Sequence, residues 1–175
     1  SIVVVGFNGP SSNNSKDRIY TEALSELLSM SSTSRIDKKL KPLNTSSSIQ
    51  DEKLSTNPKD GRAFIVTSEC SDENSEKVLK TIFNEIGNIA NNPPTDDEMQ
   101  IIKKRMLNNF SKLFEQSFAT NDIIGTSTLE NNSDFLNDFE TIVKSMTADD
   151  LVNAAKKYLD VNKASVTIIL SLIHI

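Results

Sequence analysis

The sequence has few of the residues on which many catalytic sites depend. Its 175 residues include one histidine, one cysteine and no tryptophan. The histidine, His174, is the second-last residue. Its position argues against most histidine-dependent chemistry, such as a Ser-His-Asp relay, a two-histidine zinc site or a histidine general base in a cleft. If the chain belongs to an enzyme, we therefore expect the catalytic groups to lie elsewhere.

The single cysteine, Cys70, excludes an internal disulfide and a cysteine-rich zinc site. It follows an expected strand and has no histidine partner, so we interpret it as a buried, inert thiol. Three consecutive acids, Asp96, Asp97 and Glu98, cannot point in one direction from a helix. They instead suit the positive end of a helix dipole. We expect no metal ligands and no cofactor in this chain.

Basic charge and long hydrophobic runs are also scarce. There are 19 Lys and Arg residues against 24 Asp and Glu residues, which gives a formal net charge of −5. This balance argues against a nucleic-acid partner and against adhesion to an anionic membrane surface. No run of 18 apolar residues exists, so we expect no membrane span. The chain does not begin with Met and has no basic-then-apolar leader, so any targeting segment should lie outside it.

The composition that is present is typical of a globular domain. Apolar residues make up 37% of the chain and charged residues 25%, and the length suits about one domain. β-Branched and aromatic runs predict four strands, at 1–9, 45–53, 62–69 and 163–170. The turn signal at 57–61 between the second and third strands predicts an antiparallel hairpin.

Apolar residues at helical spacing predict six helices between these strands. They cover 17–30, 73–90, 95–118, 120–130, 134–145 and 147–159, and a further helical turn is expected at 35–40. Thr95 with Glu98 forms a capping-box signature, and Thr147 with Asp150 suits the start of the last helix. The order β-α-β-β-α-α-α-α-α-β predicts the α+β class, with a small, mostly antiparallel sheet and the helices packed on one face.

Four segments in this order resemble a known family. They are the opening strand VVVGFNGPS, the Ser-Ser-x-Ser-Arg signature at 31–35, the junction from Pro93 to Met99 with the helix that follows, and the stretch from Met146 to Leu159. Together they resemble the second, non-catalytic repeat of the pitrilysin/insulinase family of inverted-motif zinc metallopeptidases. The resemblance covers about residues 1–170, and it leaves 171–175 as a tail that could be a truncation or a cloning scar.

In that family, an H-x-x-E-H motif on a different repeat binds zinc and activates water. The resemblance therefore implies that this chain is a passive domain that holds peptide substrate against zinc in a partner catalytic repeat, of the same or another chain. It also implies substrate-binding roles for Arg35, which matches the signature arginine, and for Lys41, which falls where an assisting arginine is expected. No tyrosine follows Lys41, and lysine lacks the two-pronged donor geometry of arginine.

Other interpretations stay open at this stage. Arg35 could instead be a structural donor at a helix end. The chain could be an inactive structural or assembly subunit of the same fold, with no role in proteolysis, or an unrelated α+β domain. We expect a periplasmic or extracellular parent protein, and we expect the isolated chain to be inactive.

Overall fold

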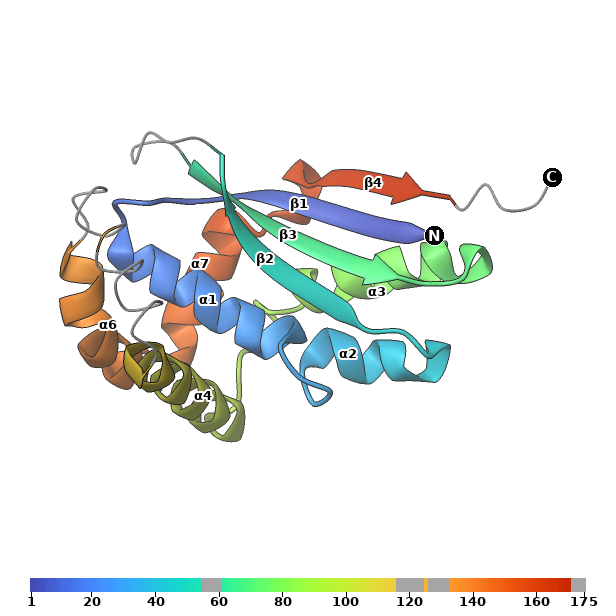
Figure 1. Cartoon of the computed structure of the whole chain (residues 1–175). Coiled ribbons are helices and arrows are strands. Elements are labelled where there is room, and N and C mark those ends of the chain that lie inside the picture. Colours follow the sequence, from blue (N-terminus) through green and yellow to red (C-terminus); the bar gives the residue numbers. More distant parts are fainter. Residues whose placement is uncertain (55–60, 116–124, 126–132, 171–175) are drawn as a thin grey trace.

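A four-stranded antiparallel sheet with helices against one face forms the described part of the chain (Figure 1). The computed structural model describes residues 1–54, 61–115, 125 and 133–170. The sheet order is β2-β3-β1-β4, and the strands are β1 (Ile2–Ser11), β2 (Ser47–Lys53), β3 (Gly61–Glu69) and β4 (Ser165–Ile169). The predicted α+β class and the β2–β3 hairpin pairing are confirmed.

The central strand β1 alternates between the core and the open face of the sheet. Val3, Val5 and Phe7 are buried on the helix side. The ring of Phe7 meets the ring of Phe64 edge-on, with 6.4 Å between their centroids. Since β1 pairs with both β3 and β4, it lies at the middle of the sheet and its alternation fixes which face is buried.

The helices form two layers on that face. Helices α1 (Ser15–Ser29), α2 (Arg35–Leu40), α3 (Ser75–Gly87) and α7 (Ala148–Tyr158) contact the sheet. Helices α4 (Asp96–Glu115) and α6 (Ser133–Ser145) pack on α1 and on each other. The described residues also form three short 3₁₀ turns, η1 (Lys41–Leu43), η2 (Asp72–Asn74) and η3 (Val161–Lys163).

Helix α1 is the centre of the core because it meets both the sheet and the outer helices (Figure 1). Its apolar residues recur every three or four positions, as expected for an amphipathic helix, and all are buried: Ile19, Ala23, Leu24, Leu27 and Leu28. Between the outer helices, the ring of Phe110 stacks on Phe139 with 4.3 Å between centroids. This stacking holds α4 against α6.

The predicted bounds differ from the structure at a few ends. Strand β1 continues past Gly9 to Ser11, with a register shift between Asn8 and Ser11. A Cβ at Gly9 would lie 3.2 Å from the carbonyl oxygen of Arg62, so the close approach of the two strands there favours glycine. Helix α3 ends at Gly87 rather than at residue 90.

Several predictions lie outside the described residues. They are the hairpin turn over 57–60, all but residue 125 of the helix predicted at 120–130, and the tail at 171–175 with its histidine. No helix in the part that the structure describes has both the length and the hydropathy needed to cross a bilayer.

Candidate functional site

The predicted site residues lie at the two ends of α2. Ile36 and Leu40 are fully buried and anchor this short helix. Ser34, which precedes it, is also buried, and its hydroxyl donates to the carbonyl oxygen of Glu26 at 3.0 Å. Six positions separate Arg35 from Lys41, which corresponds to about 9 Å along a helix axis. Lys41 lines a hollow that does not include Arg35, so the two side chains do not form one site.

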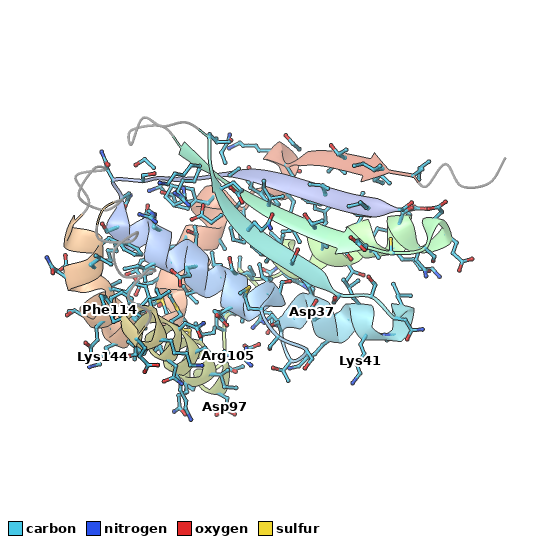
Figure 2. All side chains as sticks on the ribbon, in the orientation of Figure 1. Asp37, Lys41, Asp97, Arg105, Phe114 and Lys144 are labelled. Carbon is cyan, nitrogen blue, oxygen red and sulfur yellow. The ribbon has the colours of Figure 1, made fainter. Side chains whose placement is uncertain are left out.

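Lys41 is exposed where the chain leaves α2 (Figure 2). Pro42 cannot continue a helix, and the chain forms the single turn η1. Asn44 then takes the left-handed conformation, with φ 52° and ψ 37°, which asparagine tolerates better than most residues. This turn directs the chain into β2. Within the described residues, the Lys41 ammonium has no carboxylate within salt-bridge distance.

A hollow of about 420 Å³ lies beside this turn. It is lined by polar residues, namely Ser32, Asp37, Lys41, Asn44, Thr45 and Ser46. Lysine supplies the positive charge at its edge, and hydroxyl and amide groups surround it. Such a surface can hydrogen-bond peptide carbonyls or a carboxylate, but it contains no nucleophile paired with a base.

Asp37 is the buried acid of this hollow, and the sequence-based prediction missed it. One of its carboxylate oxygens accepts hydrogen bonds from the backbone N–H of Ser47 at 2.7 Å and from the Ser47 hydroxyl at 2.9 Å. These bonds tie α2 to the start of β2. The signal available in the sequence was the position of Asp37 beside Ile36 and three residues before Leu40, which puts it near the buried face of the helix.

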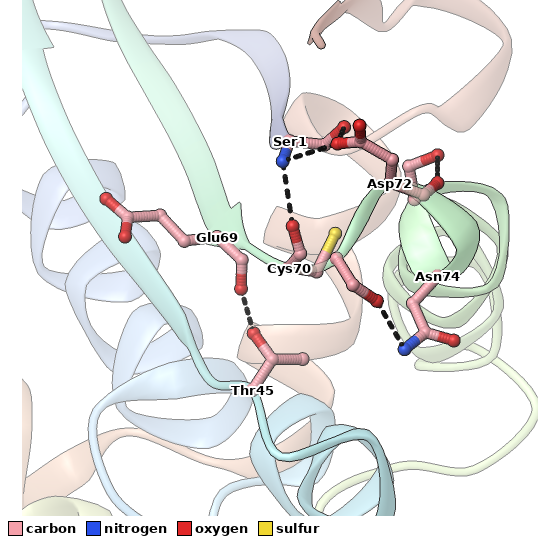
Figure 3. Close-up of polar contacts among 8 residues, drawn as sticks. Ser1, Thr45, Glu69, Cys70, Asp72 and Asn74 are labelled. Atoms are coloured by element: carbon pink, nitrogen blue, oxygen red, sulfur yellow. Dashed lines mark hydrogen bonds and ion pairs between the residues drawn. The ribbon is translucent and has the colours of Figure 1, made fainter. Parts of the chain in front are cut away.

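Cys70 lies at the corner where β3 ends (Figure 3). Beside it, the Thr45 hydroxyl donates to the carbonyl oxygen of Glu69, and Ser1 pairs with Cys70 through both backbone groups, at 2.8 and 2.9 Å. Cys70 is half-buried and packs against the core. Burial raises the pKa of its thiol, which disfavours the reactive thiolate form.

Arg35 makes four hydrogen bonds away from the hollow. Its Nε and Nη2 donate to the two carboxylate oxygens of Glu98, at 2.9 and 2.7 Å. Its Nη1 and Nη2 also donate to the carbonyl oxygens of Asn92 and Pro93, at 2.7 and 3.1 Å. These contacts favour the structural interpretation of Arg35, because they clamp α2 to the turn that precedes α4. Its role in substrate binding stays a prediction.

Glu98 serves two purposes at the start of α4. Its backbone N–H donates to the Thr95 hydroxyl and its carboxylate accepts from the Thr95 N–H, at 3.2 and 2.9 Å, which confirms the capping box. The hydrogen bond from Arg35, aided by those from Thr95, lowers the pKa of Glu98 to about 2. Its carboxylate is therefore fully ionised at neutral pH.

The remaining acids do not gather into a metal site in the described ranges. No group of three or more His, Cys, Asp or Glu side chains there could hold a metal ion. Asp96 and Asp97 are exposed in the first turn of α4. Thr147 and Asp150 form a second capping box at α7. These contacts give Glu98 at the start of α4 and Asp150 at the start of α7 structural roles.

Comparison with known proteins decides the family. Residues 1–106 match the family described as the peptidase M16 inactive domain. The chain belongs to this family. A search of curated proteins finds no match.

Solved structures share the fold of this inactive domain at low sequence identity. A protease from Helicobacter pylori superposes with a TM-score of 0.83 and 20% identity, over 94% of this chain and 40% of that one. A candidate zinc protease from Bordetella pertussis superposes with a TM-score of 0.82 and 14% identity, and the match covers 97% of this chain and 94% of that one. A chain of Complex III2 from Candida albicans superposes with a TM-score of 0.76 and 13% identity, and the match covers 95% of this chain and 42% of that one. The chain thus spans about two fifths of the Helicobacter protein.

Proposed function

We propose that this M16 inactive domain completes the peptide-binding chamber of an insulinase-like zinc metalloprotease. In this proposal, an H-x-x-E-H repeat of the same or a partner chain binds zinc and hydrolyses the peptide. The observation that carries the proposal is the family match over residues 1–106, together with the absence of an H-x-x-E-H motif from the sequence. The likeness to the longer Helicobacter protease supports it.

Lys41 is the residue we propose for substrate contact. Its ammonium is exposed at the edge of the polar hollow beside η1, where it can donate hydrogen bonds to a peptide carbonyl or carboxylate. Lysine binds such groups as a point charge, without the planar fork of arginine. Arg35, held by Glu98 and two carbonyl oxygens, would support the chamber by fixing the position of α2.

The test is the hydrolysis of peptides by the complete protease that contains this domain. We expect Lys41→Ala to lower kcat/KM about tenfold, equal to about 1.4 kcal/mol of transition-state binding. Lys41→Arg should retain the activity because it keeps the charge. Lys39→Ala is the matched control, since Lys39 is exposed on α2 but does not line the hollow. Unchanged activity of Lys41→Ala would contradict the assignment of Lys41.

An assembly subunit without proteolytic function is the second candidate. Two observations favour it. One is the likeness to a chain of Complex III2, and the other is that the sequence after Lys41 reads Pro-Leu-Asn-Thr-Ser, with no tyrosine. The parent gene distinguishes the two functions. An H-x-x-E-H motif about one domain before Ser1 supports the protease, whereas its absence or a degenerate form supports the assembly subunit.

A further inference from the structure

Asp37 has a carboxylate oxygen that no group of the described residues binds. The residue lies on α2 (Figure 2) and is 8% exposed. Both of its hydrogen bonds, from the backbone N–H and the hydroxyl of Ser47, go to one oxygen, Oδ1. The other oxygen, Oδ2, has no partner within the described part of the chain. It is not enclosed by the protein either, so it is open to solvent at the hollow that Asp37 lines.

The carboxylate of Asp37 is held in place by its neighbours. The Ser47 hydroxyl that donates to Oδ1 is itself hydrogen-bonded to the hydroxyl of Ser29. The carboxylate is therefore anchored to the start of β2 and, through Ser47, to the end of α1. A ligand that binds Oδ2 would meet an acceptor whose position is already fixed, which lowers the entropic cost of binding.

The chemistry of this oxygen restricts the ligand. A carboxylate accepts hydrogen bonds and cannot donate them, so the ligand must supply a donor. A positively charged donor suits it best, because charge-assisted hydrogen bonds are stronger than neutral ones. A divalent metal suits it poorly, since Ca²⁺ and Mg²⁺ need several oxygen ligands. Asp37 is the only acid among the described residues of the hollow, and the cationic Lys41 lies at its edge.

We propose that the hollow binds a primary ammonium group of a peptide, with Oδ2 of Asp37 as the acceptor. This inference rests on the proposed function, in which Lys41 contacts the peptide. Four positions separate Asp37 from Lys41, about 6 Å along a helix axis, and one or two extended peptide residues span that distance. Lys41 then donates to a carbonyl oxygen of the same peptide. Asp37 thus determines specificity for a peptide amino terminus or a lysine side chain, which share this chemistry.

The test compares how three peptides bind to the whole 175-residue chain. All three have one uncharged sequence that contains norleucine. The first has a free amino terminus, the second is acetylated and has lysine in place of norleucine, and the third is acetylated and neutral. We expect calorimetry to show that the first or the second binds about tenfold more tightly than the third. The tighter of these two identifies the source of the ammonium. Backbone NMR signals of residues 44–46 should shift on binding, which locates the site.

Asp37→Asn is the decisive variant. The asparagine oxygen can still accept both hydrogen bonds from Ser47, while the amide NH₂ replaces Oδ2 with a donor. The preference for an ammonium should therefore disappear in a folded protein. Ser47→Ala is the matched control, because it removes one of the two bonds but leaves the carboxylate, and it should retain the preference. Circular dichroism verifies that both variants are folded.

Three results would overturn the assignment of Asp37: equal binding of the three peptides, no binding of any of them, or a preference that survives Asp37→Asn. These results are independent of the hydrolysis measured for Lys41→Ala. Loss of hydrolysis in Lys41→Ala without an ammonium preference would contradict only the role of Asp37. An ammonium preference with unchanged hydrolysis would contradict only the role of Lys41.

Discussion

The contacts of single residues determine where α2 and α4 lie. Arg35 and Glu98 are 63 positions apart and form a two-pronged ion pair. Local signals predicted the capping role of Glu98 because Thr95 lies only three residues before it. The same signals could not predict its bond to Arg35, which exists only after α2 and α4 pack. Arg105 is a similar case. Its guanidinium lies 3.7 Å from the carboxylate of the buried Glu26, which is 79 positions earlier in the sequence and belongs to α1.

The Arg35–Glu98 pair predicts a pH-dependent contribution to stability. The folded-state pKa of Glu98, about 2, lies below the value of about 4.3 for an unfolded glutamate. The stabilisation is therefore complete above about pH 4.3 and is lost as the pH falls toward 2. Since the pair is partly exposed, we expect Glu98→Gln to lower the free energy of unfolding by about 1–2 kcal/mol at pH 7.

Urea denaturation of the wild type and Glu98→Gln between pH 2 and 7 measures this effect. The difference between the two proteins should shrink below about pH 4.3 and vanish near pH 2. The control is Glu76→Gln, which removes an exposed pair with Lys80 on one helix and should change the stability little. A difference that stayed constant across this pH range would show that the charge of Glu98 is not its cause.

At the scale of the elements, hydrophobic periodicity and cap residues located each described strand and α-helix, but not the 3₁₀ turns η1 and η3. Helix α7 begins after Thr147 as expected and ends at Tyr158. The differences arise where tertiary contacts override local signals. Gly9 reads as the end of a strand, but its close approach to Arg62 lets β1 continue. The turn at Asn44 depends on a left-handed conformation that the residue types alone do not require.

The capping box of α7 provides a test at this scale. The Thr147 hydroxyl accepts from the Asp150 N–H at 3.2 Å and the Asp150 carboxylate accepts from the Thr147 N–H at 2.9 Å. Thr147→Ala removes the first bond and should cost about 1 kcal/mol of unfolding free energy. Thr147→Ser keeps the hydroxyl and should cost much less. Equal losses in the two variants, measured by thermal unfolding, would mean that packing of the threonine methyl group matters more than the cap.

At the scale of the whole molecule, the sequence predicted the fold class and the antiparallel hairpin, but not the strand order β2-β3-β1-β4. Periodicity shows which face of a strand is buried, not which strands are neighbours. Lys41 was predicted as a site residue only through the family resemblance. Periodicity could place Asp37 near the buried face of α2, but it could not predict the bonds to Ser47, because Ser47 belongs to a different element.

The composition of the chain predicts its chemistry in isolation. With one histidine, one cysteine and no H-x-x-E-H motif, the purified chain should retain far less than one zinc ion per molecule after exposure to zinc and desalting. It should also fail to cleave peptides. Elemental analysis and a peptide-cleavage assay check both expectations. Stoichiometric zinc on this chain alone would contradict the assignment of the metal to a partner repeat.

The central position of β1 affects how the chain folds during synthesis. β1 leaves the ribosome before the other strands, yet one of its two neighbours, β4, begins only at Ser165. Until then the nascent chain carries an unpaired, Val-rich strand edge that other chains could bind. Pairing across more than 160 residues is also entropically costly and slow. Strand β4, which follows the other three described strands in the sequence, therefore completes this sheet, so folding intermediates that precede it are the species most in need of a chaperone.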